Sequence, residues 1–241
     1  MEALILRSEP AGEADSLVTV LTRDGRRMEG FAKSARLMPS KLRAGAMPLT
    51  VSDVTFIPGR HQWHLRSAQP VLFFPNFRES REALAAVSAI AAMLAEGTTE
   101  VSDPELYADA ARAFRDLHTA ASVREPRALL ARRAAAAFLK TLAHLGYAPV
   151  FDRCTSCSMT ETLTALSPSA GGILCGPCAS ENPESRTLSP EGTSTLKARA
   201  IPRSGGDVRE LLRFLSAFSA LHLPGADAAV HSAVMLFTSG A

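Results

Sequence analysis

All four cysteines of the chain fall within one short stretch, as two pairs with the spacing Cys-x2-Cys. Cys154 and Cys157 form the first pair, Cys175 and Cys178 form the second, and seventeen residues separate them. Two residues between cysteines let a tight turn aim both sulfur atoms at one ion, and the intervening residues can fold as a hairpin that brings the pairs together. The spacing therefore predicts a metal site with four thiolate ligands, carried by a zinc-ribbon-like insert over residues 150–180.

Zinc is the metal that four thiolates favour, because they complete a tetrahedron around it. A complete tetrahedron leaves no position for an activated water, so we expect one structural Zn²⁺ and no hydrolytic centre. An iron–sulfur cluster stays open as an alternative, although its cysteines are usually spaced asymmetrically. Disulfides and a redox pair are the other interpretations. The start of the chain lacks the basic and apolar segments of an export signal, so a reducing, cytoplasmic location disfavours disulfides.

The first 75 residues predict a small barrel. Short alternating or β-branched runs separated by turn residues indicate five strands, at residues 3–7, 17–22, 27–32, 50–57 and 62–68. Asp24-Gly25 and Pro58-Gly59 are typical hairpin turns between neighbouring runs. Five strands in this length are typical of a closed barrel of the OB type, although strand counting alone does not exclude an SH3-like barrel.

Residues 76–241 predict a helical domain, which makes the whole an α+β, multidomain fold. Apolar residues recur at helical spacing over five segments, residues 78–95, 103–121, 126–145, 207–223 and 226–237. With 46% hydrophobic and 21% charged residues, the chain can bury a sizeable core. The longest nearly apolar run, residues 83–95, is shorter than the roughly 20 residues that cross a bilayer, so we expect no membrane partner.

Positive charge is concentrated in the barrel. Residues 23–43 hold seven cations against two acids, a local excess of +5 in a chain whose formal net charge is +2. An excess of this kind on a strand and a loop of an OB-type barrel indicates binding to a nucleic-acid backbone, although a solvated face is the simpler alternative. The candidate DNA-binding residues are Arg26, Arg27, Lys33, Arg36, Lys41 and Arg43, extended by Arg60 and Arg66. Trp63 and Phe31 could stack on bases, but their alternation with polar neighbours favours core positions.

Motifs of catalysis are absent from the sequence. It contains no P-loop, and no Gly-Lys pair occurs at all, which argues against a nucleotide-driven motor. Neither HExxH nor GxSxG is present. We therefore expect a protein that is not an enzyme and uses no nucleotide.

Several segments together resemble the bacterial RecO family of recombination mediators. They are residues 12–22 with the Asp24-Gly25-Arg26 turn, residues 31–36 running to Ser40-Lys41-Leu42, and residues 142–149 leading into the first cysteine pair. The last of these, together with Gly171-Gly172-Ile173-Leu174 before Cys175, is the segment that best distinguishes this family from others. The sequence departs from the family pattern at Ser34, where the family usually has glycine, at Met47-Pro48-Leu49, and at Ala233, near which flanking basic residues are missing.

The resemblance implies a DNA repair and homologous-recombination mediator that binds single- and double-stranded DNA, anneals complementary strands and assists recombinase loading. It also implies partnership with RecR and with the C-terminal tail of single-stranded-DNA-binding protein, and a nucleoid-associated place in the cytoplasm. A groove for such an acidic, apolar tail is predicted on the third helix, at Arg132, Arg133, Phe138, Leu139 and Lys140. Ordinary helix-surface charge is the alternative there. The chief alternative for the whole chain is a zinc-containing adaptor that binds proteins but not DNA.

Overall fold

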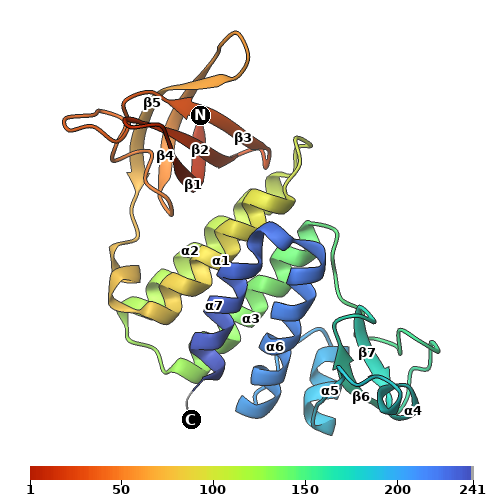
Figure 1. Ribbon diagram of the computed structural model, residues 1–241. Coiled ribbons are helices and arrows are strands. Elements are labelled where there is room, and N and C mark those ends of the chain that lie inside the picture. Colours follow the sequence, from red (N-terminus) through yellow and green to blue (C-terminus); the bar gives the residue numbers. More distant parts are fainter. Residues whose placement is uncertain (240–241) are drawn as a thin grey trace.

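The N-terminal part of the chain is a closed barrel of five strands (Figure 1). The structure is a computed structural model and describes residues 1–239. The strands are β1 (Glu2–Ala11), β2 (Asp15–Thr22), β3 (Arg27–Ala32), β4 (Val51–Pro58) and β5 (Trp63–Leu72). Their order around the barrel is β1-β2-β3-β5-β4, in which only β3 and β5 run parallel. The predicted OB-type barrel is confirmed.

Side-chain alternation explains how the barrel is filled. Ala3 and Ile5 point into the barrel with Val18 and Val20, whereas Leu4 belongs to the core of the helices. Both faces of β1 are therefore buried over residues 3–6, because one lines the barrel and the other packs on the helical body. The turn after β2 takes the shape that its sequence predicts, with Gly25 at a φ of 81°.

Helices make up most of the remaining chain (Figure 1). They are the 3₁₀ turn η1 (Pro75–Glu79), α1 (Arg81–Gly97), α2 (Pro104–Ser122), α3 (Arg127–His144), α4 (Gly176–Ser180), α5 (Pro190–Lys197), α6 (Gly205–His222), the 3₁₀ turn η2 (Pro224–Ala226) and α7 (Asp227–Thr238). Helix α1 packs against α2, α3 and α7, and it also contacts β1. Asp103 caps α2 by accepting hydrogen bonds from the backbone N–H groups of Glu105 and Leu106.

A small three-stranded sheet carries the cysteine segment. Its strands are β6 (Leu163–Ser167), β7 (Gly172–Cys175) and β8 (Arg186–Thr187), in the order β7-β6-β8. Gly172 lies against the backbone of Val150: a Cβ on Gly172 would stand 2.1 Å from the carbonyl oxygen of Val150. The chain that enters the segment therefore packs directly on β7. Because β8 pairs with β6, the sheet extends past residue 180, where the insert was predicted to end.

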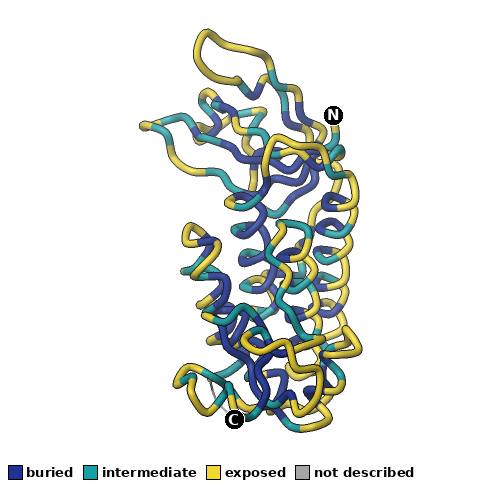
Figure 2. The backbone as a smooth tube through the Cα atoms, turned by 90° about the vertical axis from the view of Figure 1, so that its right-hand side faces the viewer, coloured by how far each residue is buried: buried dark blue, intermediate teal, exposed yellow. Residues whose placement is uncertain are grey.

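Buried residues form two clusters, one inside the barrel and a larger one that runs through the helical body into the cysteine segment (Figure 2). The larger cluster includes Leu4, Leu6, Leu21 and Val51 from the outer side of the barrel. The barrel therefore docks on the helices through apolar side chains. Among the helices in residues 1–239, none combines the length and the apolar character that crossing a bilayer requires.

Candidate functional sites

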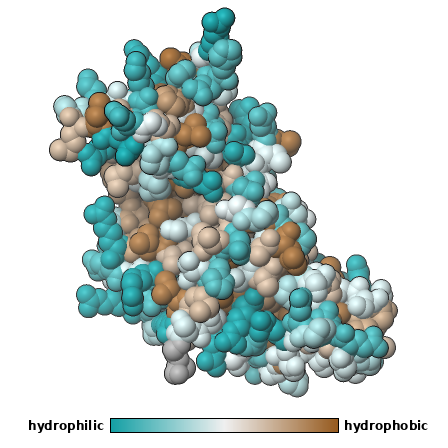
Figure 3. All heavy atoms as spheres, viewed as in Figure 1, coloured by the Kyte–Doolittle hydropathy of each residue, from teal (hydrophilic) through white to brown (hydrophobic). Residues whose placement is uncertain are grey.

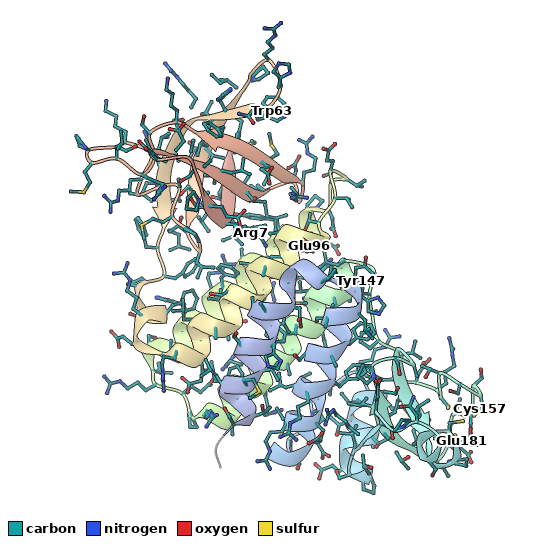
Figure 4. The ribbon with its side chains drawn as sticks, viewed as in Figure 1. Arg7, Trp63, Glu96, Tyr147, Cys157 and Glu181 are labelled. Carbon is teal, nitrogen blue, oxygen red and sulfur yellow. The ribbon has the colours of Figure 1, made fainter. Side chains whose placement is uncertain are left out.

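The four cysteines converge at one point of the small sheet. Their sulfur atoms all lie within 4.8 Å of one another, and those of Cys157 and Cys175 are 3.6 Å apart. Sulfur atoms bound at about 2.3 Å to a tetrahedral zinc ion lie about 3.8 Å apart, so the spacing fits one such ion. Cys154 and Cys175 are buried and Cys157 is exposed, which puts the cluster at the edge of the molecule (Figure 4).

The backbone around the first pair folds as the two-residue spacing predicts. The N–H of Cys154 donates to the carbonyl of Met159, and the N–H of Ser158 donates to the carbonyl of Cys154. Although burial opposes ionisation, hydrogen bonds from the backbone at Cys175, Cys157 and Ser156 lower the pKa of Cys154 to about 6. The thiolate is the form that binds metal, so this sulfur is biased towards a ligand, whereas the hydrogen bond with Cys175 raises the pKa of Cys178 in the same cluster. These residues could bind one metal ion.

Three connections share the end of the barrel that points away from the helices. They are the β1–β2 turn, the connection that leaves β3 and the β4–β5 hairpin. The strand pairing places them together: Ala11 at the end of β1 pairs with the start of β2, which pairs with Ala32 at the end of β3, and β3 pairs with the start of β5 at Trp63. The opposite end, at the β2–β3 turn, touches the helical body through Ser102, whose hydroxyl donates to the carbonyl of Asp24. We call the free end the outer end of the barrel. Hydrophilic side chains cover much of it on the face shown in Figure 3.

The long connection after β3, residues 33–48, begins at this outer end and is held against the barrel. Buried Ala35 and Ala46 pack in the barrel core, while Lys33, Arg36 and Arg43 remain exposed. Arg36 donates to the carbonyl of Gly12, and its backbone N–H donates to the carbonyl of Ala14. Small apolar anchors and these hydrogen bonds hold the connection against the barrel.

Arg36 and Arg43 line the same pocket of about 300 Å³ beside β1 and β2. Ser8 and Ser16 also line it, so hydroxyl and guanidinium groups face one cavity. Within residues 1–239, no ion pair involves Lys33, Arg36, Lys41, Arg43, Arg60 or Arg66. These cations keep their charge available to an external anion.

Two of the candidate DNA-binding residues, Arg26 and Arg27, do not lie with that group. They lie at the end of the barrel that faces the helices. A guanidinium nitrogen of Arg26 is 2.6 Å from Asp24, and one of Arg27 is 3.5 Å from Glu29. Their charges are compensated locally, because Asp24 lies in the same turn as Arg26, and Glu29 lies two residues from Arg27 on the same face of β3.

Trp63 is 44% exposed, so the expected core position is wrong for this residue. It starts β5 at the rim of the barrel, where its cross-strand neighbour Gly30 has no side chain to cover it. Phe31 is half-buried and its ring meets that of His64 edge-on, with centroids 6.2 Å apart.

The predicted groove on α3 is only partly present at the named residues. Phe138 is fully buried in the helical core and cannot line a surface, which corrects that prediction. Arg132 donates to the carbonyl of Pro202, and Arg133 is 2.6 Å from Glu125, so both are engaged within the protein. Leu139 and Lys140 do line a pocket, of about 620 Å³.

The other walls of this pocket come from residues that sequence reasoning missed. Phe151, Arg153, Lys197, Arg199 and Ile201 line it together with the end of α3. The pocket therefore combines apolar side chains with four cations. Two of these have ion pairs, Lys140 with Asp109 at 2.7 Å and Arg153 with Asp152 at 3.7 Å. These residues are up to about sixty positions apart, and the folding of the cysteine segment back onto α3 is what unites them. No local pattern could have identified them.

Comparison with known proteins covers both parts of the chain. Residues 1–74 match the sequence family described as "Recombination protein O N terminal", and residues 78–228 match "Recombination protein O C terminal". The DNA repair protein RecO of Heliobacterium modesticaldum is 29% identical over 227 residues, covering 90% of this chain and 80% of that protein. The DNA repair protein RecO of Nocardioides sp. is 27% identical over 238 residues, covering 92% and 93%.

Proposed function

Since this chain belongs to the RecO family of DNA repair proteins, we propose that it binds single- and double-stranded DNA at the outer end of the barrel and anneals complementary strands. In this role it would assist recombinase loading during homologous recombination, together with RecR. The proposal of RecR as a partner is supported by family membership alone. DNA binding would associate the protein with the nucleoid in the cytoplasm.

The observation that supports DNA binding best is the set of exposed cations at the outer end of the barrel that have no ion pair within residues 1–239. Lys33, Arg36 and Arg43 lie on one connection, and two of them share a pocket with serine hydroxyls. Guanidinium and hydroxyl groups are common ligands of phosphate oxygens. Two acids, Glu13 and Asp15, lie in or beside the neighbouring β1–β2 turn. Asp15 accepts a 2.6 Å hydrogen bond from the backbone N–H of Ser34 in the same connection, so the positive charge at this end is partly offset.

Annealing follows from the same charges. Two strands repel each other through their phosphates, and a basic surface that displaces condensed counterions lowers this repulsion. Such contacts do not read bases, so we expect binding without strong sequence preference. The bases stay available to pair with a second strand.

Salt-titrated binding of a labelled single-stranded oligonucleotide tests this function. The proposal predicts affinity that falls steeply and linearly on a logarithmic salt scale, together with faster annealing of complementary strands. A chain that binds no DNA at low salt while still binding protein partners would support the adaptor alternative and contradict the proposal.

For the cysteine cluster we propose one structural Zn²⁺, held by Cys154, Cys157, Cys175 and Cys178. The sulfur spacing and the all-sulfur donor set support this metal. Bound there, zinc would tie the two cysteine pairs of a segment with a small core of its own. This metal site would stabilise the fold and make no contact with DNA.

For the pocket beside α3 we propose the acidic C-terminal tail of single-stranded-DNA-binding protein as the ligand. Phe151 and Ile201 offer apolar surface, and Lys197 and Arg199, which have no ion pair within residues 1–239, offer positive charge for acidic residues. Arg153 adds a charge that it shares with Asp152 at 3.7 Å. Titration with a labelled acidic peptide that ends in apolar residues tests the assignment. Arg153→Glu should weaken binding about tenfold, whereas Arg133→Glu, outside the pocket, should not. Equal affinities for the two variants would contradict it.

A further inference from the structure

We propose that the indole of Trp63 is a stacking platform for an unpaired base of single-stranded DNA, separate from the phosphate-binding cations. The inference rests on the proposed DNA binding at the outer end of the barrel and adds a contact that distinguishes single strands from duplex. Bases in a duplex are already stacked on their neighbours, so a side chain can stack only on one that is unpaired.

Trp63 is exposed where a strand residue of its size is usually buried. Its exposed fraction is 44%, although the residues two and five positions later on β5, Leu65 and Ala68, are each only 3% exposed. Its cross-strand neighbours are Gly30 on β3 and Pro58 on β4. Gly30 has no side chain, and the ring of Phe56 fills the space where its Cβ would stand, at 2.3 Å. Pro58 is itself exposed, and with these neighbours the indole keeps its 44% exposure. In Figure 4, Trp63 lies at the base of the β4–β5 hairpin, on the side of the barrel away from the helices.

The indole also has no aromatic partner among residues 1–239. Phe31 and His64 contact each other at 6.2 Å, and the remaining ring contacts lie in the helical body. Successive side chains of a strand point to opposite faces, so Trp63 and His64 do not share a surface. One aromatic face at the rim of the barrel is left open for a planar ligand.

Charge favours a nucleic acid as that ligand. Arg60 precedes Trp63 at the tip of the hairpin; it is exposed and has no ion pair within residues 1–239. Arg66 is exposed too, but by the same alternation it lies on the His64 side of β5. The residues next to Trp63 along the chain, Gln62 and His64, are polar. A cationic groove with an aromatic side chain is the usual arrangement by which OB-type barrels hold single strands.

Fluorescence tests the inference directly, because Trp63 is the only tryptophan of the chain. The unmodified protein is titrated with an oligo-dT, and binding is followed at the same time by the anisotropy of a dye on the oligonucleotide. Stacking predicts that tryptophan emission is quenched in parallel with the rise in anisotropy. An abasic oligonucleotide with the same phosphates should raise the anisotropy at low salt but leave the tryptophan emission unchanged.

Variants give an independent readout. Trp63→Ala should weaken binding of oligo-dT about tenfold and binding of duplex DNA less than twofold, whereas Trp63→Phe should retain most of the affinity. Ile57→Ala removes another exposed apolar side chain of the same hairpin and should change neither affinity.

The outcomes separate this inference from the proposed function. DNA binding with unchanged tryptophan emission and an unaffected Trp63→Ala variant would overturn the stacking role and leave phosphate binding standing. If neither oligo-dT nor duplex DNA raises the anisotropy, the proposed function itself fails. Quenching by a protein partner but not by oligo-dT would assign the indole to a protein interface and overturn the inference as well.

Discussion

The hydroxyl of Tyr107 on α2 donates a 2.9 Å hydrogen bond to Oε1 of Glu2 on β1. This bond joins the helical body to the first strand of the barrel. The β2–β3 turn contacts the same region, where Gly25 lies so close to Asp103 that a Cβ at Gly25 would stand 1.8 Å from its carbonyl oxygen. The helices therefore hold the inner end of the barrel and leave its basic outer end open.

Tyr107→Phe should lower the free energy of unfolding by about 1.5 kcal/mol, because it leaves a carboxylate without its donor at a largely buried contact. Burial and the neighbouring Glu2 carboxylate both raise the pKa of Tyr107, which keeps the hydroxyl protonated as a donor at neutral pH. Chemical denaturation measures the change. Tyr147→Phe is the control, because within residues 1–239 its hydroxyl has no described hydrogen bond. Equal effects of the two substitutions would show that the Glu2 contact contributes nothing.

Ser34→Gly should stabilise the barrel by about 0.5 kcal/mol. Ser34 has a φ of 57°, a left-handed conformation that costs a residue with a side chain about 1 kcal/mol more than glycine. Part of this gain is offset because glycine has more freedom in the unfolded chain. Ser34→Ala, which keeps the Cβ, should bring no gain. Thermal unfolding of both variants checks the prediction, and a lower melting temperature for Ser34→Gly would contradict it.

Purified protein should contain one zinc ion per chain. Removing it with a chelator should lower the free energy of unfolding by about 4 kcal/mol when free zinc exceeds its Kd by about 1,000-fold. Cys178→Ser should abolish binding of the metal, whereas Ser156→Ala, within the first cysteine pair, should retain it. Metal analysis and thermal unfolding measure both effects. Because the cluster lies far from the barrel (Figure 1), chelation should change DNA affinity less than twofold; a larger loss would couple the two sites.

Asp109→Asn should destabilise the protein by about 1 kcal/mol at pH 7 and have little effect in acid. Although burial opposes it, hydrogen bonds from Lys140 at 2.7 Å and His144 at 2.8 Å lower the pKa of Asp109 below its ordinary value of 3.8. A carboxyl whose pKa is lowered by folding stabilises the fold above pH 3.8. That stabilisation is lost as pH falls through the lower folded pKa.

Denaturation of the Asp109→Asn variant and the unmodified protein, in parallel from pH 7 to about pH 2, measures this difference while any acid loss of zinc affects both. Asp116→Asn, an exposed position on the same helix, is the control and should stay near zero at every pH. A constant difference for Asp109→Asn across the range would show that its charge is not responsible.

Much of this fold could be predicted from local sequence. The β3 bounds, the Asp24-Gly25 turn and the capping role of Asp103 each depend on a few adjacent residues whose conformational preferences agree with the fold. The cysteine cluster was predictable because its spacing alone constrains the geometry. Helix α5 was missed, because it has only eight residues and its start depends on buried Asp207 of α6, which accepts hydrogen bonds from Ser189.

The site residues were harder to predict because exposure and pairing depend on distant parts of the chain. Trp63 alternates with polar residues like a core position, but it lies at the rim of the barrel opposite a glycine. Phe138 has the helical spacing of a groove residue and yet faces the core. Arg26 contributes to the charge excess of the sequence, but Asp24 compensates it in space.

The central claim is that DNA binds the outer end of the barrel through cations without ion pairs. It is tested most directly by neutralising two cations at each end of the barrel and comparing salt-titrated binding of single-stranded DNA. Lys33→Gln with Arg43→Gln should weaken binding at least about tenfold and reduce the salt slope by about 0.7 per lost contact, about 1.4 in all. Arg26→Gln with Arg27→Gln, an equal loss of charge, should change affinity less than twofold. Equal losses from the two pairs, or no loss from the first, would contradict the claim.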